Sequence, residues 1–137
     1  MSAKIFVNLP VKDLKKTMEF FSKLGFTFNK QFTDDNAACM VIGENLYSML
    51  LTHKHFKGFL PQGKEIADAH KTTEALVAFT CESRAAVDEM VRKAVAAGGT
   101  TYKKPEDHGF MYAHGFQDLD GHVWEPFWMD PSAVKGG

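Results

Sequence analysis

Apolar residues near the start of the chain follow the spacing of a strand and then that of a helix. Residues 4–10 form a short apolar run ending at Pro10, which predicts a strand that stops where proline removes a backbone donor. A helix is predicted next, because apolar residues recur at the spacing of one helix face: Leu14, Met18, Phe21 and Leu24. Asp13 is its predicted N-cap, and Gly25 is the residue that ends it.

Three further strands are predicted before the middle of the chain. Phe26, Phe28 and Phe32 alternate with polar residues, which is typical of a half-buried strand. Residues 37–42 and 46–52 follow as strands joined by a short polar connection that suits a hairpin. The first half is therefore predicted to run strand, helix, strand, strand, strand.

The periodicity is lost from residue 54 to residue 73, where Gly58, Pro61 and Gly63 interrupt a mixture of charged and aromatic residues. A connection of this length is typical of a functional flap or of a linker between modules. We expect residues 1–137 to form a single domain. Its predicted parts are a first module at residues 1–56, a connector at residues 57–73 and a second module at residues 74–131.

The second half repeats the order of the first. Residues 75–81 predict a strand, and Ser83 caps a helix that ends at residues 98–99. Extended segments are then predicted at residues 100–103, 110–117 and 122–128. This repeat predicts an α+β fold in which two βαβββ modules form curved mixed sheets around a cavity, with one helix outside each sheet. The alternative has the sheets flattened over a continuous apolar core, which leaves no pocket.

Charge and composition exclude several classes of function. The formal net charge of -1, with 24% charged residues of both signs, gives no basic field to hold nucleic acid or an anionic membrane. Cys39 and Cys81 are too few for a disulfide framework. Because no signal-peptide layout and no apolar run of about 20 residues is present, we expect a cytoplasmic protein. The 12 Phe and 7 Met residues supply either an aromatic core or the lining of a ligand pocket.

Three segments carry a resemblance to a known family. They are Asn8 to Leu14 (NLPVKDL), Phe20 to Phe26 (FFSKLGF) and Asp118 to Glu125 (DLDGHVWE). Together with the duplicated layout, they make nearly the whole chain resemble the glyoxalase/bleomycin-resistance/extradiol-dioxygenase (vicinal oxygen chelate) superfamily, and within it the lactoylglutathione-lyase-like branch. The resemblance implies the two-module fold, a pocket for a small molecule between the modules, and a homodimer.

The resemblance also implies where a divalent metal would lie. In the metal-dependent members, ligands come from the first and last strands of each module, and these positions fall here on Phe6, near Leu50, near Leu76 and on Glu125. Only Glu125 is a metal-ligating residue type, whereas Zn, Fe, Ni or Mn centres need three or four donors. The ligand set therefore does not support the family's metal, and the cofactor stays open.

Other residues could carry chemistry without that metal. On an extended chain Tyr112 and His114 point the same way, so Glu125 on a neighbouring strand is predicted to orient His114 as a general base, with all three as catalytic residues. The competing interpretation is a structural histidine bonded to a backbone carbonyl. The predicted pocket residues are Phe6, Leu50, Leu76, Phe110 and Trp124.

His53 and His55 lie two residues apart at a predicted strand end, where both side chains would emerge on one face. They either share a metal or are simply exposed. Two functions follow for the whole chain. The first is a small-molecule lyase- or isomerase-like enzyme with a degenerate metal site, and the second is a non-catalytic protein that binds and sequesters a drug or metabolite.

Overall fold

The chain folds as two units that each contain a mixed sheet and one long helix. In the computed structural model, which describes residues 2–133, the units comprise residues 1–68 and 69–137. Their boundary lies within the predicted connector, residues 57–73. Two expectations stay predictions: that both units form a single domain, and that a cavity lies between them.

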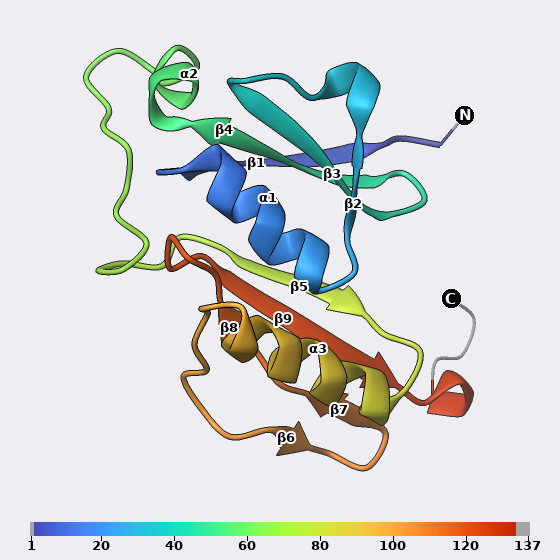
Figure 1. Cartoon of the computed structure of the whole chain (residues 1–137). Coiled ribbons are helices and arrows are strands. Elements are labelled where there is room, and N and C mark those ends of the chain that lie inside the picture. The colour runs from blue at the N-terminus through green and yellow to red at the C-terminus, as the bar shows by residue number, and fades with distance from the viewer. Residues whose placement is uncertain (1, 134–137) are drawn as a thin grey trace. The chain divides into compact units, whose positions relative to one another are not determined.

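The first unit contains a four-stranded mixed sheet and one long helix (Figure 1). Its elements are β1 (Ile5–Val11), α1 (Leu14–Lys23), β2 (Thr27–Asn29), the short 3-10 helix η1 (Lys30–Phe32), β3 (Ala37–Gly43), β4 (Leu46–Thr52) and α2 (His53–Lys57). The strand order is β1-β4-β3-β2, with β1 parallel to β4 and the other pairs antiparallel.

Both predicted ends of α1 are confirmed. The side chain of Asp13 accepts a hydrogen bond of 3.1 Å from the backbone N–H of Lys16, which satisfies a donor that the first turn leaves unpaired. Gly25 follows the helix at φ 102°, a left-handed conformation that glycine adopts without the strain of a Cβ. The helix therefore ends where the sequence predicts.

The two faces of the first sheet differ in burial. The helix α1 packs on β3 and β4 (Figure 1). One face of these strands carries side chains with no exposed surface: Ala38, Met40, Ser48 and Leu50. The opposite face, which we call the open face of the first sheet, carries Phe6, Asn8, Tyr47 and Met49, which are exposed or half-buried, and also the buried residues Ala37, Cys39 and Leu51. Because side chains alternate along a strand, residues one apart in register lie on opposite faces.

The second unit repeats this plan. Its elements are β5 (Leu76–Thr80), α3 (Arg84–Ala96), β6 (Glu106–Asp107), β7 (Met111–Ala113), β8 (Phe116–Gln117), β9 (Val123–Met129) and the 3-10 helix η2 (Pro131–Ala133). The strand order is β5-β9-β7-β6, with β8 also paired to β9. The strand β5 runs parallel to β9, and the other pairs are antiparallel, so this sheet is mixed as well.

The helix α3 covers one face of the second sheet (Figure 1). Its N-cap is Ser83, as predicted, and its buried residues are Val87, Val91 and Ala94. On the covered face Trp124 and Phe116 are fully buried. The other face, which we call the open face of the second sheet, carries Leu76, Ala78, Glu125 and Phe127.

Two predictions in the second unit are wrong. The expected strand at residues 110–117 is two short strands, β7 and β8, both paired with β9. The expected strand at residues 100–103 is reduced to a single bridge between Thr100 and Gln117, and β6 takes the edge of the sheet instead. The register of β7 and β8 on β9 is continuous, so the interruption does not move side chains to the other face.

The region of His53 and His55 also differs from the prediction. The strand β4 ends at Thr52, whose side-chain oxygen accepts a hydrogen bond of 3.3 Å from the backbone N–H of His55 and caps the helix α2. Residues two apart on a helix do not face the same side. The expected pair of histidines on one strand face is therefore wrong.

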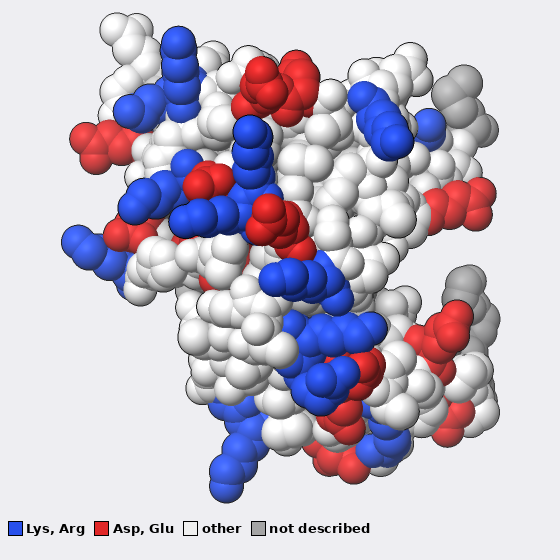
Figure 2. Space-filling model, in the orientation of Figure 1, with Lys and Arg blue, Asp and Glu red and all other residues white. Residues whose placement is uncertain are grey.

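The surface carries charges of both signs. Figure 2 shows Lys and Arg interspersed with Asp and Glu on the visible face of the molecule. Within residues 2–133, none of the helices combines the length and the apolar composition that crossing a bilayer requires.

Candidate functional site

Glu125 lies in the middle of β9 on the open face of the second sheet. It is in register with Ala78 of β5, so Leu76 and Phe127 point to the same side of the sheet. Leu76 exposes 61% of its surface, and Glu125 is half-buried. The sheet therefore presents a carboxylate among apolar neighbours.

Tyr102 packs over the same face beside Glu125. The register that pairs Ala113 with Phe127 and Phe116 with Trp124 places Gly115 opposite Glu125. A Cβ on Gly115 would lie 2.1 Å from the Tyr102 Oη, so a glycine is needed for the phenol to occupy this position.

The environment of Tyr102 keeps its phenol neutral. Burial raises the pKa of Tyr102, and the negative charge of Glu125 raises it further. A neutral phenol, which is a hydrogen-bond donor, therefore lies close to a carboxylate acceptor. Sequence reasoning missed Tyr102, although a glycine inside a predicted strand signals a close approach of this kind.

Lys103, the next residue in the chain, places a positive charge near Tyr102 that opposes the rise in the pKa of its phenol. Its ammonium forms an ion pair of 2.5 Å with Glu106, and this contact is the main cause of the raised pKa of Lys103. The charge of Glu125 adds a smaller contribution of the same sign. Lys103 is thus held mainly by Glu106.

His114 lies on the opposite face of the sheet from Glu125. Its backbone N–H donates to the carbonyl of Pro126 at 3.3 Å, so His114 is in register with the neighbour of Glu125 and points to the side of α3. There it lines a groove of about 560 Å³ together with Asp88 and Arg92 of the helix. The predicted contact in which Glu125 orients His114 is therefore wrong.

Tyr112 also faces α3. Its hydroxyl donates a hydrogen bond of 2.6 Å to Asp88, and this bond is the main reason that the pKa of Tyr112 is raised to about 12. The guanidinium of Arg84 lies 5.3 Å from the centre of the Tyr112 ring and 5.0 Å from that of Trp128. Arg84 also pairs with Asp107 at 2.7 Å, so this cluster fastens the hairpin of β6 and β7 to the helix.

The other predicted pocket residues are divided between the faces. Phe6 lies on the open face of the first sheet and stacks on Tyr47 with ring centres 4.7 Å apart. Leu50 lies three residues after Tyr47, the partner of Phe6, so its side chain points to the opposite face, where α1 buries it. Trp124 is likewise buried under α3. Those two expectations of a pocket wall are wrong. Phe110 is 53% exposed and precedes β7.

The residues at the family's metal positions do not fit a metal ion. Phe6 and Leu76 offer no donor atom. Leu50 points to the covered face, and its neighbour Met49, which lies on the open face with Phe6, offers only a weak thioether ligand. Glu125 alone has the required chemistry. In the described part of the chain, no three side chains of His, Cys, Asp or Glu come together in a way that could hold an ion.

Two mixed sheets, each covered by one long helix, define a protein of the vicinal-oxygen-chelate class: the first unit has the order βαβββ, and the second has the same order with its middle strand divided into β7 and β8 and with Glu125 on its last strand. The chain belongs to the Glyoxalase/Bleomycin resistance protein/Dioxygenase superfamily, whose family model matches residues 5–125. The resemblance carried by the sequence segments is thereby confirmed. A search among curated proteins gave no significant match.

Solved structures of similar proteins agree with this assignment. The hypothetical protein SA1046 from S. aureus is 26% identical with a TM-score of 0.77, and the match covers 93% of this chain and 94% of that one. A glyoxalase/bleomycin resistance protein/dioxygenase family enzyme from Burkholderia phytofirmans is 20% identical with a TM-score of 0.78, covering 93% and 99%. The fosfomycin resistance protein FosX from Listeria monocytogenes is 22% identical with a TM-score of 0.66, covering 93% and 91%. These likenesses establish the fold.

Proposed function

We propose that this protein binds a small amphipathic molecule on the open face of the second sheet, with Glu125 as the charged anchor. The observation that carries the proposal is the position of Glu125 and Tyr102 among exposed apolar side chains such as Leu76. A carboxylate in an apolar setting favours a ligand that combines an apolar body with a positive or hydrogen-bond-donating group.

Two features support binding over the metal-dependent chemistry of the family. Phe6 and Leu76 replace donors at the positions where a metal would be held, and neither side chain can polarise a carbonyl oxygen. The predicted catalytic residues His114 and Tyr112 lie on the other face of the sheet from Glu125, so the sheet separates both of them from the carboxylate.

Backbone amide NMR titration with benzylamine tests this proposal, because its ammonium carries a positive charge next to a ring. Saturable shifts are expected at Ala78, Gly115 and Phe127, and the uncharged benzyl alcohol should bind less tightly. Replacing Glu125 by Gln should weaken benzylamine binding about fivefold to tenfold. The matched control Glu74→Gln, at an exposed position before β5, should bind as the wild type does. Equal losses in both variants, or no saturable shift, would overturn the proposal.

A second function, a lyase- or isomerase-like enzyme that acts by proton transfer, is favoured by one observation. The raised pKa of Tyr102 keeps a proton donor beside the Glu125 carboxylate, and these two groups can act as general acid and general base on one substrate. The direct test is exchange of carbon-bound hydrogen in D₂O, followed by NMR on the hemithioacetal of methylglyoxal and glutathione and on small hydroxyketones. Exchange that Glu125→Gln abolishes supports this function, and exchange that survives in that variant contradicts it.

We further propose that the protein is a cytoplasmic homodimer. Both cysteines, Cys39 and Cys81, are free thiols, as expected in a reducing compartment. The edge strands β1 and β5 carry exposed apolar side chains, including Ile5 at 55% and Leu76 at 61%. Light scattering coupled to size-exclusion chromatography tests the dimer, and a mass of one chain at micromolar concentration contradicts it.

A further inference from the structure

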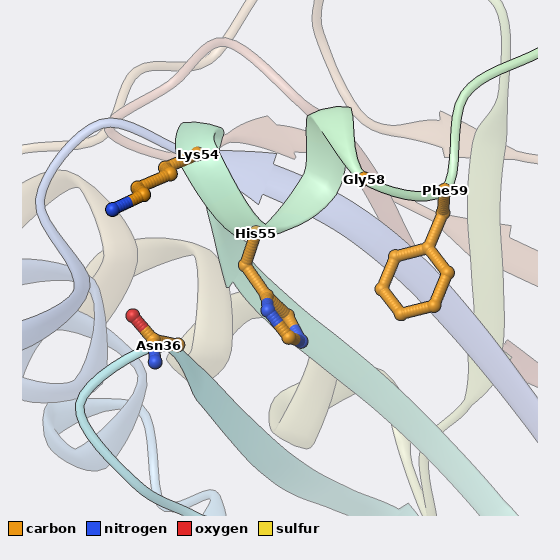
Figure 3. Close-up of a pocket in the computed structure, with 5 residues that line it drawn as sticks. All are labelled: Asn36, Lys54, His55, Gly58 and Phe59. Atoms are coloured by element: carbon orange, nitrogen blue, oxygen red, sulfur yellow. The ribbon is translucent and has the colours of Figure 1, made fainter.

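A pocket of about 290 Å³ in the first unit is lined by residues around the helix α2, including His55, one of the two histidines noted in the sequence (Figure 3). Asn36 comes from the turn before β3, and Lys54, His55, Gly58 and Phe59 come from α2 and the residues that follow it. The backbone N–H of Thr52 donates to the carbonyl of Asn36 at 3.0 Å. This bond ties the turn to the end of β4, so residues of both segments line the same pocket.

The polar lining of this pocket favours an anion. Lys54 contributes an ammonium, His55 an imidazole and Asn36 an amide, and the lining contains no carboxylate. Two acidic residues precede Asn36 in the chain: Asp34, whose carboxylate accepts from the backbone N–H of Asn36 at 2.8 Å and of Ala37 at 3.0 Å, and Asp35, which is exposed and does not line the pocket. Figure 3 shows the His55 ring between Asn36 and Phe59, with the Lys54 ammonium extending on the side of Asn36.

The remaining wall is aromatic and open to solvent. Phe59 exposes 70% of its surface, more than any other large hydrophobic residue described, and meets the edge of the His55 ring at 5.4 Å between ring centres, with the planes at 85°. Two rings at this angle leave a ring face available for stacking. The volume lies at the lower limit of small-molecule sites and suits a single ring with a short substituent.

We propose that this pocket binds a one-ring aromatic carboxylate. The ring of the ligand packs against Phe59 and His55, and its carboxylate accepts hydrogen bonds from Lys54 and Asn36. The ligand has the opposite charge to the one proposed for the Glu125 face, so this site is a second one and does not depend on that proposal. Because the pocket is shallow, we expect a Kd on the order of 0.1–1 mM for a simple ligand.

Benzoate is the probe, and the same NMR titration measures its binding. Saturable shifts are expected at the backbone amides of Asn36, His55 and Phe59. Benzyl alcohol keeps the ring without the charge, and acetate keeps the charge without the ring, so both should bind at least fivefold more weakly. Acetate binding equal to that of benzoate would show a simple anion site and would overturn the aromatic part of the proposal.

Variants at each wall complete the test. Lys54→Met keeps most of the side-chain length without the charge and should weaken benzoate binding about threefold to fivefold. Phe59→Ala should weaken it by a similar factor. The matched controls are Lys57→Met on the same helix and Phe32→Ala at another exposed aromatic residue, and both should bind benzoate as the wild type does. Amide spectra confirm that each variant is folded. No saturable shift in the wild type, or equal losses in the controls, overturns the proposal.

Discussion

The indole Nε1 of Trp124 donates a hydrogen bond of 2.9 Å to one carboxylate oxygen of Asp118 inside the second unit. Trp124 has no exposed surface, and Asp118 exposes 5%. The other oxygen of this carboxylate accepts from the backbone N–H of Asp120 at 2.9 Å and of His122 at 3.0 Å. The acidic residue that opens the segment DLDGHVWE therefore organises the turn and fastens it to β9, which carries Glu125.

Replacing Asp118 by Asn should destabilise the protein. An amide has only one oxygen, so its NH₂ group must face either the indole N–H or the two backbone N–H groups, and at least one buried donor loses its acceptor. We expect the free energy of unfolding to fall by about 2–3 kcal/mol, measured by urea denaturation. Asp35→Asn is the control, since Asp35 is exposed, and its effect should stay within about 0.5 kcal/mol. Equal losses in the two variants would contradict this role of Asp118.

Replacing Gly115 by Ala should displace the Tyr102 ring. The added Cβ would lie 2.1 Å from the Oη and 2.8 Å from the Cζ of Tyr102, so the ring has to leave the face beside Glu125. The expected cost in the free energy of unfolding is about 1–3 kcal/mol. Gly43→Ala is the control, because its Cβ would approach no atom closer than 3.4 Å.

The displacement of Tyr102 has a second test in the double variant. If the clash causes the loss, Gly115→Ala should cost less when Tyr102 is already Ala than when it is Tyr. Thermal or urea unfolding of the single and double variants measures this coupling. Additive losses would show that Tyr102 is not the group that requires glycine at this position.

Glu125 and His114 should act independently, because the sheet separates their side chains. Benzylamine binding should weaken in Glu125→Gln and stay unchanged in His114→Gln. The double variant should then behave like Glu125→Gln alone, since groups without shared partners contribute additively. A loss of binding in His114→Gln, or a coupling between the two substitutions, would restore the arrangement in which Glu125 orients His114.

The order of elements was predictable because it depends on local patterns. The apolar spacing in α1, the cap at Asp13 and the glycine at residue 25 each follow from contacts within a few residues. The same holds for Ser83 at the start of α3. One local signal was missed: Thr52 caps α2 through the backbone N–H of His55 three residues later, so the expected strand end at His55 is a helix.

The site was less predictable because it depends on register. Side chains in a strand alternate with a period of two, so a shift of one residue moves a side chain to the other face of the sheet. Leu50 points to the covered face of the first sheet, whereas its neighbour Met49 points to the open face. In the second sheet, His114 points to the face that α3 covers, and Glu125 points to the open face. Tyr102 approaches Glu125 from a loop without regular structure, and strand pairing cannot place such a residue.

The phenol of Tyr112 should titrate at an unusually high pH and link stability to pH. Its hydrogen bond to Asp88 raises the pKa to about 12 from the ordinary value of 10.0. The folded state therefore holds this proton more tightly than the unfolded state does. The resulting stabilisation is fully present below about pH 10 and is lost as the pH rises through about 12.

Two variants of this pair separate the hydrogen bond from the charge. Tyr112→Phe should lower the free energy of unfolding below about pH 10 by about 1 kcal/mol, and its difference from the wild type should shrink above that pH. Asp88→Asn keeps an acceptor oxygen and removes the negative charge, so the pKa of Tyr112 should fall below the wild-type value. The ¹³C shift of the Tyr112 Cζ, followed against pH, measures both. If Tyr112 titrates at the same pH in the wild type and in Asp88→Asn, the carboxylate of Asp88 does not set the pKa of Tyr112.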